Sequence, residues 1–197
     1  MSKTSSKEKK LIRVPSDIVA KLNEAANRAG RSFYDYTSEV LEQALRASEL
    51  GRPLKEIMDF FELMSVQRNA GLTITFSELL NYLISMLYPK EEKALHERWY
   101  EAGVWYGTYL QVKFRNKRTL DIFTKLLSES WWEINEVNLS KEEEGFVLRC
   151  VSFTLSLERT KLLMSFLEGV IDSMEYEIVK KDCIRGMIIL NFTERGS

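Results

Sequence analysis

A short basic segment near the N-terminus constrains this chain more than any other feature. Residues 9–14 (Lys-Lys-Leu-Ile-Arg-Val) are typical of a strand that ends at Pro15, and two amphipathic helices follow directly. A lone strand leaves its backbone N–H and C=O groups unpaired and is not stable by itself. The same strand from a second copy would complete a two-stranded antiparallel ribbon, so the segment predicts a homodimer.

The two helices carry their own start and stop signals. Ser16 is the expected N-cap of the first helix, and apolar residues recur at helical spacing until Gly30. Ser32 is expected to cap the second helix, with Asp35 completing a short-acid variant of the capping box. This second helix is expected to end near Gly51.

This order of basic strand, polar link, helix, Gly-x-Ser and helix resembles the ribbon-helix-helix family of transcription factors over about residues 8–50. The matching residues are Arg13-Val-Pro-Ser-Asp-Ile18, Leu22, Gly30-Arg-Ser32 and Val40-Leu41. The resemblance implies a dimer whose paired strands enter the major groove of double-stranded DNA, where each base pair shows a distinct donor and acceptor pattern.

Alternation along the strand separates its two faces. Ile12 and Val14 would face the helices, whereas Lys9, Leu11 and Arg13 would face the DNA bases. Arg13 could bond guanine O6 and N7. Leu11 departs from the polar residue usual in the family and could contact only a thymine methyl group. Whether the ribbon reads a specific base sequence therefore stays open.

Phosphate contacts are expected from the arm and from the start of the second helix. Lys7 and Lys10 lie beside the strand, and Arg31 precedes the free amides of Ser32 and Phe33. Two alternatives remain at this point: Ser32 acts only as a cap, or the strand docks on the C-terminal domain and its lysines are solvated.

The charge distribution supports a polyanionic partner. Residues 1–32 hold eight Lys or Arg and three Asp or Glu residues, a net charge of +5 in a chain of net charge −1. The remainder is therefore at −6. The basic end of the chain is the end expected to meet nucleic acid.

The fold class expected is α+β. Four divisions are predicted: a disordered basic arm at 1–7, the ribbon-helix-helix domain at 8–51, a helical connector at 52–89, and an α+β sensor or interaction domain with an antiparallel sheet at 90–197. Beyond residue 52 the expected helices are 53–68, 75–87, 90–114, 119–130 and 157–171, and the expected strands are 132–139, 146–153, 175–180 and 187–192. Thr75 and Glu78 predict a capping box, and Pro89 is expected to end a helix.

The C-terminal domain resembles the vinyl-reductase-type sensor domain, whose fold is shared with vesicle-tethering subunits and haem nitric-oxide sensors. The resemblance is carried by Glu101-Ala-Gly-Val-Trp-Tyr-Gly107, Phe166-Leu-Glu-Gly169 and Cys183-Ile-Arg-Gly186. Lys180 stands where the family has an acidic residue, and the family's second cysteine is missing near Leu190. A two-cysteine metal or redox role is therefore not expected.

An apolar ligand pocket is expected on the helix at 90–114. Gly103 and Gly107 would let another helix approach closely, and the pocket would be lined by these two glycines with Trp99, Tyr106 and Tyr109. The alternative is that these aromatic residues form ordinary core. His96 could be a haem ligand by analogy, although a surface or helix-packing role is favoured.

Other classes of function find no support in the sequence. One histidine and two separate cysteines, Cys150 and Cys183, offer no catalytic triad and no conventional metal site, so no enzyme activity, catalytic residue, metal or cofactor is expected. The acidic run at 142–144 is most simply a solvated turn.

No segment is apolar enough to span a membrane, and a cytoplasmic location is expected. The many charged residues and few prolines suit an archaeal-like thermophile.

The function that this pattern favours is a homodimeric transcriptional regulator whose C-terminal domain senses a small apolar molecule or a protein partner. Two alternatives are a nonspecific architectural DNA-binding protein and a scaffold or ligand-binding protein that does not bind DNA.

Overall fold

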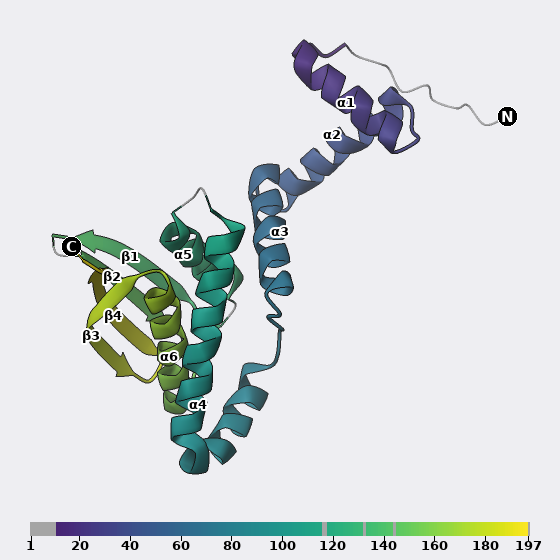
Figure 1. The fold of residues 1–197 in the computed structure, drawn as a ribbon. Coiled ribbons are helices and arrows are strands. Elements are labelled where there is room, and N and C mark those ends of the chain that lie inside the picture. The colour runs from purple at the N-terminus through teal and green to yellow at the C-terminus, as the bar shows by residue number, and fades with distance from the viewer. Residues whose placement is uncertain (1–10, 116–117, 132, 144, 197) are drawn as a thin grey trace. The chain divides into compact units, whose positions relative to one another are not determined.

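The computed structural model describes residues 11–115, 118–131, 133–143 and 145–196 (Figure 1). Its helices are α1 (Ser16–Arg28), α2 (Phe33–Glu49), α3 (Leu54–Asn69), α4 (Ser77–Lys113), α5 (Thr119–Ser130) and α6 (Leu157–Ser173), and its strands are β1 (Glu136–Glu142), β2 (Gly145–Val151), β3 (Tyr176–Ile184) and β4 (Met187–Glu194). The chain divides into two compact units, Met1–Met58 (unit 1) and Asp59–Ser197 (unit 2). The boundary lies inside α3, so residues 59–89 of the expected connector belong to unit 2.

Unit 1 consists of α1 and α2 and the turn between them. Gly30 adopts a left-handed φ of +65°, and the amide of Arg31 reaches back to the carbonyl of Ala26 at 3.0 Å. The Ser32 hydroxyl accepts a hydrogen bond from the Asp35 amide at 3.1 Å, which confirms its predicted cap. The prediction for Ser16 is wrong: Pro15 occupies the cap position of α1 without a side-chain bond, and its carbonyl accepts the first helical amides.

The strand predicted at 9–14 is described only in part. Residues 11–15 have no strand pairing within the described chain, and Lys9 and Lys10 lie outside the described residues, as does the arm at 1–7. Ile12 and Val14, which alternation places toward the helices, are exposed in the single chain. The intermolecular ribbon therefore stays a prediction.

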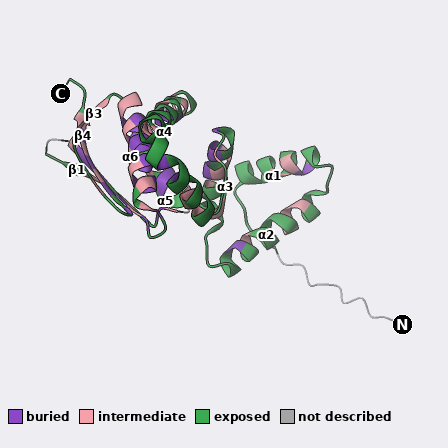
Figure 2. Ribbon diagram, turned by 90° about the horizontal axis from the view of Figure 1, so that it is seen from below, coloured by how far each residue is buried: buried purple, intermediate pink, exposed green. Residues whose placement is uncertain are grey.

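Unit 2 combines a four-stranded antiparallel sheet, in the order β1-β2-β4-β3, with helices, so the α+β class is confirmed. Alternation decides the packing of β4, where Ile188, Leu190 and Phe192 are buried and their neighbours are not. Helix α6 packs against the sheet and α4 packs on α6 (Figures 1 and 2). The buried side chains gather between these layers.

The crossing of α4 and α6 depends on glycine. A Cβ atom at Gly103 would overlap the carbonyl of Phe166, and one at Gly169 would overlap the carbonyl of Tyr100. A Cβ at Gly107 would overlap the Ser173 hydroxyl. The prediction that Gly103 and Gly107 admit a close helix is confirmed, and that helix is α6.

The start of α4 differs from the sequence prediction, whereas its interruption near Pro89 agrees with it. Element α4 consists of two helical stretches that meet at a kink with non-helical backbone at Glu91, so the break falls two residues after Pro89. The predicted capping box is wrong. Phe76 is the N-cap residue and no side chain caps the helix, so Thr75 does not pair with the amide of Glu78.

Candidate functional site

A half-open groove of about 960 Å³ lies in unit 2. It is bounded by α3, the segment that joins α3 to α4, two stretches of α4, the end of α5 and part of α6. Its wall is mainly apolar and includes the large side chains of Phe61, Met64, Leu72, Trp99, Trp131 and Phe166. The volume falls within the range of small-molecule sites.

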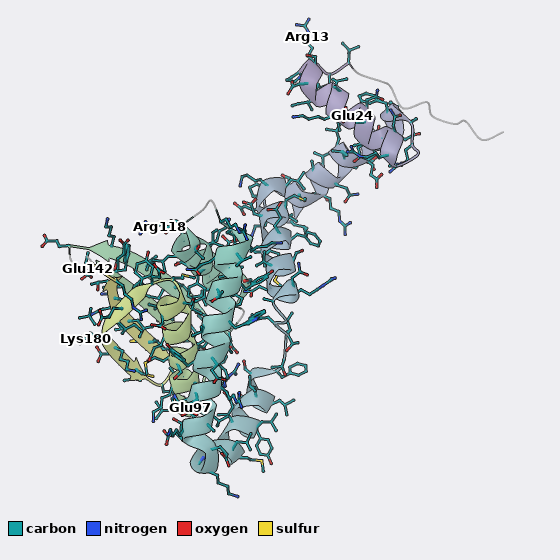
Figure 3. The ribbon with its side chains drawn as sticks, in the orientation of Figure 1. Arg13, Glu24, Glu97, Arg118, Glu142 and Lys180 are labelled. Atoms are coloured by element: carbon teal, nitrogen blue, oxygen red, sulfur yellow. The ribbon has the colours of Figure 1, made fainter. Side chains whose placement is uncertain are left out.

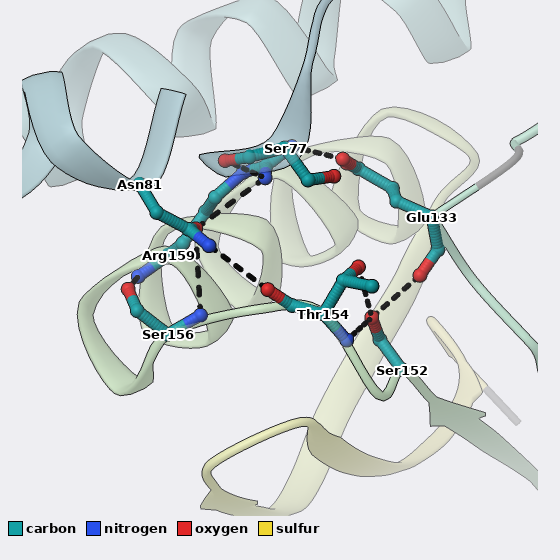
Figure 4. A network of polar contacts seen from close by, with 7 residues as sticks. All are labelled: Ser77, Asn81, Glu133, Ser152, Thr154, Ser156 and Arg159. Carbon is teal, nitrogen blue, oxygen red and sulfur yellow. Dashed lines mark hydrogen bonds and ion pairs between the residues drawn. The ribbon is translucent and has the colours of Figure 1, made fainter. Parts of the chain in front are cut away.

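A buried arginine forms the polar end of this groove. Arg159, near the start of α6, is 2% exposed and forms an ion pair with Glu133, whose side chain is 24% exposed (Figure 4). Both residues line the groove. The Nε of Arg159 is buried and has no hydrogen-bond partner in the described part of the chain. A buried guanidinium needs a negative partner, since its desolvation is otherwise uncompensated.

The same guanidinium ties α6 to the start of α4. Its Nη1 donates to the Ser77 carbonyl at 3.3 Å and to Asn81 Oδ1 at 3.4 Å (Figure 4). The Asn81 amide nitrogen in turn donates to the Thr154 carbonyl at 2.9 Å. These bonds join segments that are more than 70 residues apart in the sequence.

A second set of buried polar groups supports the other side of the groove. Gln67 Nε2 donates to the Ser130 hydroxyl, and the Tyr106 hydroxyl donates to Gln67 Oε1, both at 2.8 Å. Burial raises the pKa of the Tyr106 phenol above its ordinary value, and nearby Tyr109 adds to the rise. The phenol is therefore a fixed neutral donor that holds α3 on α4.

The predicted pocket residues are only partly brought together. Trp99 lines the groove, whereas Gly103 and Gly107 lie at the crossing with α6. Tyr106 is buried behind the groove, and Tyr109 stacks on Trp105 at 5.6 Å between ring centroids. The alternative of ordinary core packing describes Tyr106 better than a pocket does.

His96 has a packing role in this structure. Its Nε2 lies 2.9 Å from the Tyr88 hydroxyl and its Nδ1 lies 2.7 Å from the Ser165 hydroxyl, so it joins α4 to α6. Burial, followed by the neighbouring Glu92 carboxylate, raises the pKa of Tyr88. Among the described residues, no group of three His, Cys, Asp or Glu side chains could hold a metal ion.

The two cysteines are separate free thiols. Cys150 is buried in the sheet, and burial raises its pKa to about 12. Cys183 is half-buried on β3, and burial raises its pKa as well. Neither thiol lines the groove.

The DNA-contact residues predicted in unit 1 are exposed where they are described. Arg13 projects away from α1 (Figure 3) and forms no ion pair with a described residue. Leu11 is 95% exposed. Arg31 is paired with Glu39, and Ser32 and Phe33 begin α2 at the surface. Lys7, Lys9 and Lys10 lie outside the described residues.

Unit 1 also exposes an unusual amount of apolar surface. Within residues 11–58, Ala26 and Ala47 are the only buried side chains. The large apolar residues that remain exposed there are Leu11, Ile12, Val14, Ile18, Val19, Phe33, Tyr34, Val40, Leu41, Leu45, Leu50, Leu54 and Met58. Figure 2 shows the helices of this unit mostly in the colour of exposed residues.

The polar end of the groove is not predicted from the sequence. Arg159 lies in the polar stretch Glu158-Arg-Thr-Lys161, where an arginine is typical of a solvated helix face. Its partners Glu133 and Ser77 are 26 and 82 residues away in the sequence. No local pattern in the sequence connects these three residues.

No family model matches the sequence, and no curated protein matches it significantly. Among solved structures, the chain is similar to one titled "Crystal structure of an oxygen binding H-NOX domain related to soluble guanylate cyclases (oxygen complex)". The identity is 13%, the match covers 71% of this chain and 86% of that chain, and the TM-score is 0.38. Similarity at this level assigns neither a fold nor a ligand.

No helix in the described part of the chain is long and apolar enough to cross a membrane.

Proposed function

We propose that the protein is a homodimeric DNA-binding regulator, with a ribbon-helix-helix domain in unit 1 and a ligand-binding groove in unit 2. The observation that carries the proposal is the exposed apolar surface of unit 1. Two helices of 13 and 17 residues that bury only two alanines remove little apolar area from water. Isolated helices of this length are marginal, because most helical stability in proteins comes from tertiary packing.

A second copy provides the missing packing in this proposal. The exposed residues Ile18, Val40 and Leu41 belong to the apolar stripes of α1 and α2, and a partner's stripes would cover them. The extended residues before α1 then pair with the same residues of the partner as an antiparallel ribbon.

DNA is the proposed partner of the ribbon. The +5 charge of residues 1–32 supplies the attraction to phosphate, and the exposed Arg13 supplies a donor fork for a guanine edge. The amides at the start of α2, next to Ser32, suit a backbone phosphate. Arg31 would also contact this phosphate, by leaving its ion pair with Glu39.

A second candidate function is nonspecific architectural DNA binding. Leu11 favours it, because a 95% exposed leucine on the face proposed to meet the bases offers no hydrogen bond. The two candidates differ in the ratio of affinities for an operator and for random DNA at one salt concentration, which is near one for an architectural protein.

The test is a gel-shift titration of the Arg13→Ala variant on a DNA site selected by the wild-type protein. Loss of a bidentate guanine contact weakens binding by about 1–3 kcal/mol. Arg46→Ala is the matched control, since Arg46 is an exposed arginine near the end of α2, far along the helix from its start. Equal affinities for wild type and Arg13→Ala would contradict the proposed base contact.

A further inference from the structure

We propose that the groove of unit 2 binds an amphipathic carboxylate: a molecule with one carboxylate and an apolar body, held by Arg159. The inference rests on the proposed function, because it names the class of molecule that unit 2 would sense. It also names the event at the site, in which the ligand carboxylate replaces Glu133 on the guanidinium.

The apolar body follows from the wall of the groove. Phe61, Leu72, Trp99 and Phe166 come from four separate segments and leave a space of about 960 Å³ between them. An apolar ligand body in this groove would remove the apolar wall from water and gain dispersion contacts with its side chains.

The negative charge follows from the charges on the wall. Among the described residues, three arginines line the groove, Arg68, Arg98 and Arg159, against the single acid Glu133. Arg98 is paired at 3.1 Å with Glu101, which lies outside the groove. The surplus of positive charge selects an anion and disfavours a cation.

The different burial of Arg159 and Glu133 suggests that the ligand carboxylate takes the place of the Glu133 carboxylate on the guanidinium. Arg159 is almost completely buried, so it must keep a negative partner at every stage. Glu133 is about one quarter exposed, so water can solvate its carboxylate when it leaves. A ligand carboxylate would then keep the guanidinium paired, and its second oxygen could accept from Nε, which has no hydrogen-bond partner among the described residues.

Binding at this point would act on helices that reach beyond the groove. Arg159 also holds Ser77 and Asn81 at the start of α4. Phe61 and Met64 of the wall belong to α3, which crosses the boundary between the two units. A molecule in contact with these residues therefore contacts a helix that both units share.

The test is isothermal titration calorimetry on the full chain with decanoate and with decanamide, which share the acyl chain and differ in charge. Both are used below the concentration at which decanoate forms micelles. A carboxylate that bonds a buried guanidinium is expected to bind at least about tenfold tighter than the amide. Equal affinities, or tighter binding of decanamide, would overturn the assignment of an anion.

Three variants test separately the contribution of the Glu133 carboxylate and the contribution of the groove volume. Glu133→Gln removes the competing carboxylate and is expected to tighten decanoate binding severalfold without a comparable change for decanamide. Ala102→Trp fills the groove without removing a charge and is expected to abolish binding of both molecules. Ala94→Trp, at an exposed position of the same helix outside the groove, is the control and should bind as wild type does. Unchanged decanoate binding in Ala102→Trp would overturn the site.

The titration contains no DNA, and the gel-shift experiment contains no ligand. Decanoate binding without any DNA affinity would contradict the proposed function and leave the carboxylate site standing. DNA binding with no uptake of decanoate would overturn this inference and leave the proposed function intact.

Discussion

The two units bury their apolar residues in different ways. Unit 2 encloses large side chains such as Phe123, Leu148 and Phe192 between its sheet and helices. Unit 1 buries Ala26 and Ala47 alone among residues 11–58 and leaves the apolar stripes of both helices at the surface. Unit 2 therefore has a core of its own, whereas unit 1 depends on surface outside itself for comparable burial. The following substitutions test this difference.

The largest effect is expected in unit 2, at the crossing of α4 and α6. Gly103→Val places side-chain atoms where the Phe166 carbonyl lies, and the backbones must separate. Overpacking of this kind costs about 3 kcal/mol or more in the free energy of unfolding, measured by chemical denaturation. The control is Ala94→Val on the exposed face of α4, which loses only a few tenths of a kcal/mol in helix propensity. Equal stability of the two variants would contradict the close crossing.

An intermediate effect is expected in unit 1, on dimerisation rather than on the stability of one chain. Val40→Asp puts a charge on the apolar stripe of α2, and loss of its burial weakens the dimer by about 2–3 kcal/mol. Sedimentation equilibrium measures the change in the dimer dissociation constant. Val112→Asp makes the same change at a more exposed valine of unit 2, 59% against 37%, and should leave dimerisation unaffected. A dissociation constant unchanged in Val40→Asp would refute the proposed interface.

The smallest effect is expected where the units are alike, at their helix caps. Ser32 accepts from the Asp35 amide at 3.1 Å, and Ser156 accepts from the Arg159 amide at 3.2 Å. Alanine at either position should lower the free energy of unfolding of its unit by about 1 kcal/mol. Thermal unfolding monitored by circular dichroism measures this change. If Ser32 also meets phosphate, Ser32→Ala weakens DNA binding and Ser156→Ala does not. Equal DNA affinity of both variants would restrict Ser32 to capping.

Local patterns predict much of the fold because their physical causes are local. Helical periodicity predicts α5 at 119–130, as observed, and Gly30 and Ser32 mark the turn between α1 and α2. Alternation predicts the strands of the sheet, although β1 lies at 136–142 and not at 132–139, and β3 extends to Ile184, further than expected. In each case the decisive interaction lies within a few residues of the pattern.

The polar end of the groove arises from contacts between distant segments. Arg159 Nη1 donates to the Ser77 carbonyl, a bond across 82 residues. The ion pair of Arg159 with Glu133 joins residues 26 apart in the sequence. A single sequence contains no signal for such pairs, and so the groove could be anticipated at Trp99 but its charged end could not.

Helix α3 has a practical consequence for anyone who wishes to separate the two units. Their boundary falls inside a continuous helix, Leu54–Asn69, and not in an exposed loop. A protease that cleaves extended chain would find no accessible site there. A gene that stops at Met58 would encode only the first five residues of α3, which are too few to form a stable helix. Swapping one unit for that of another protein would need the junction placed in the turn before Leu54, with α3 kept whole.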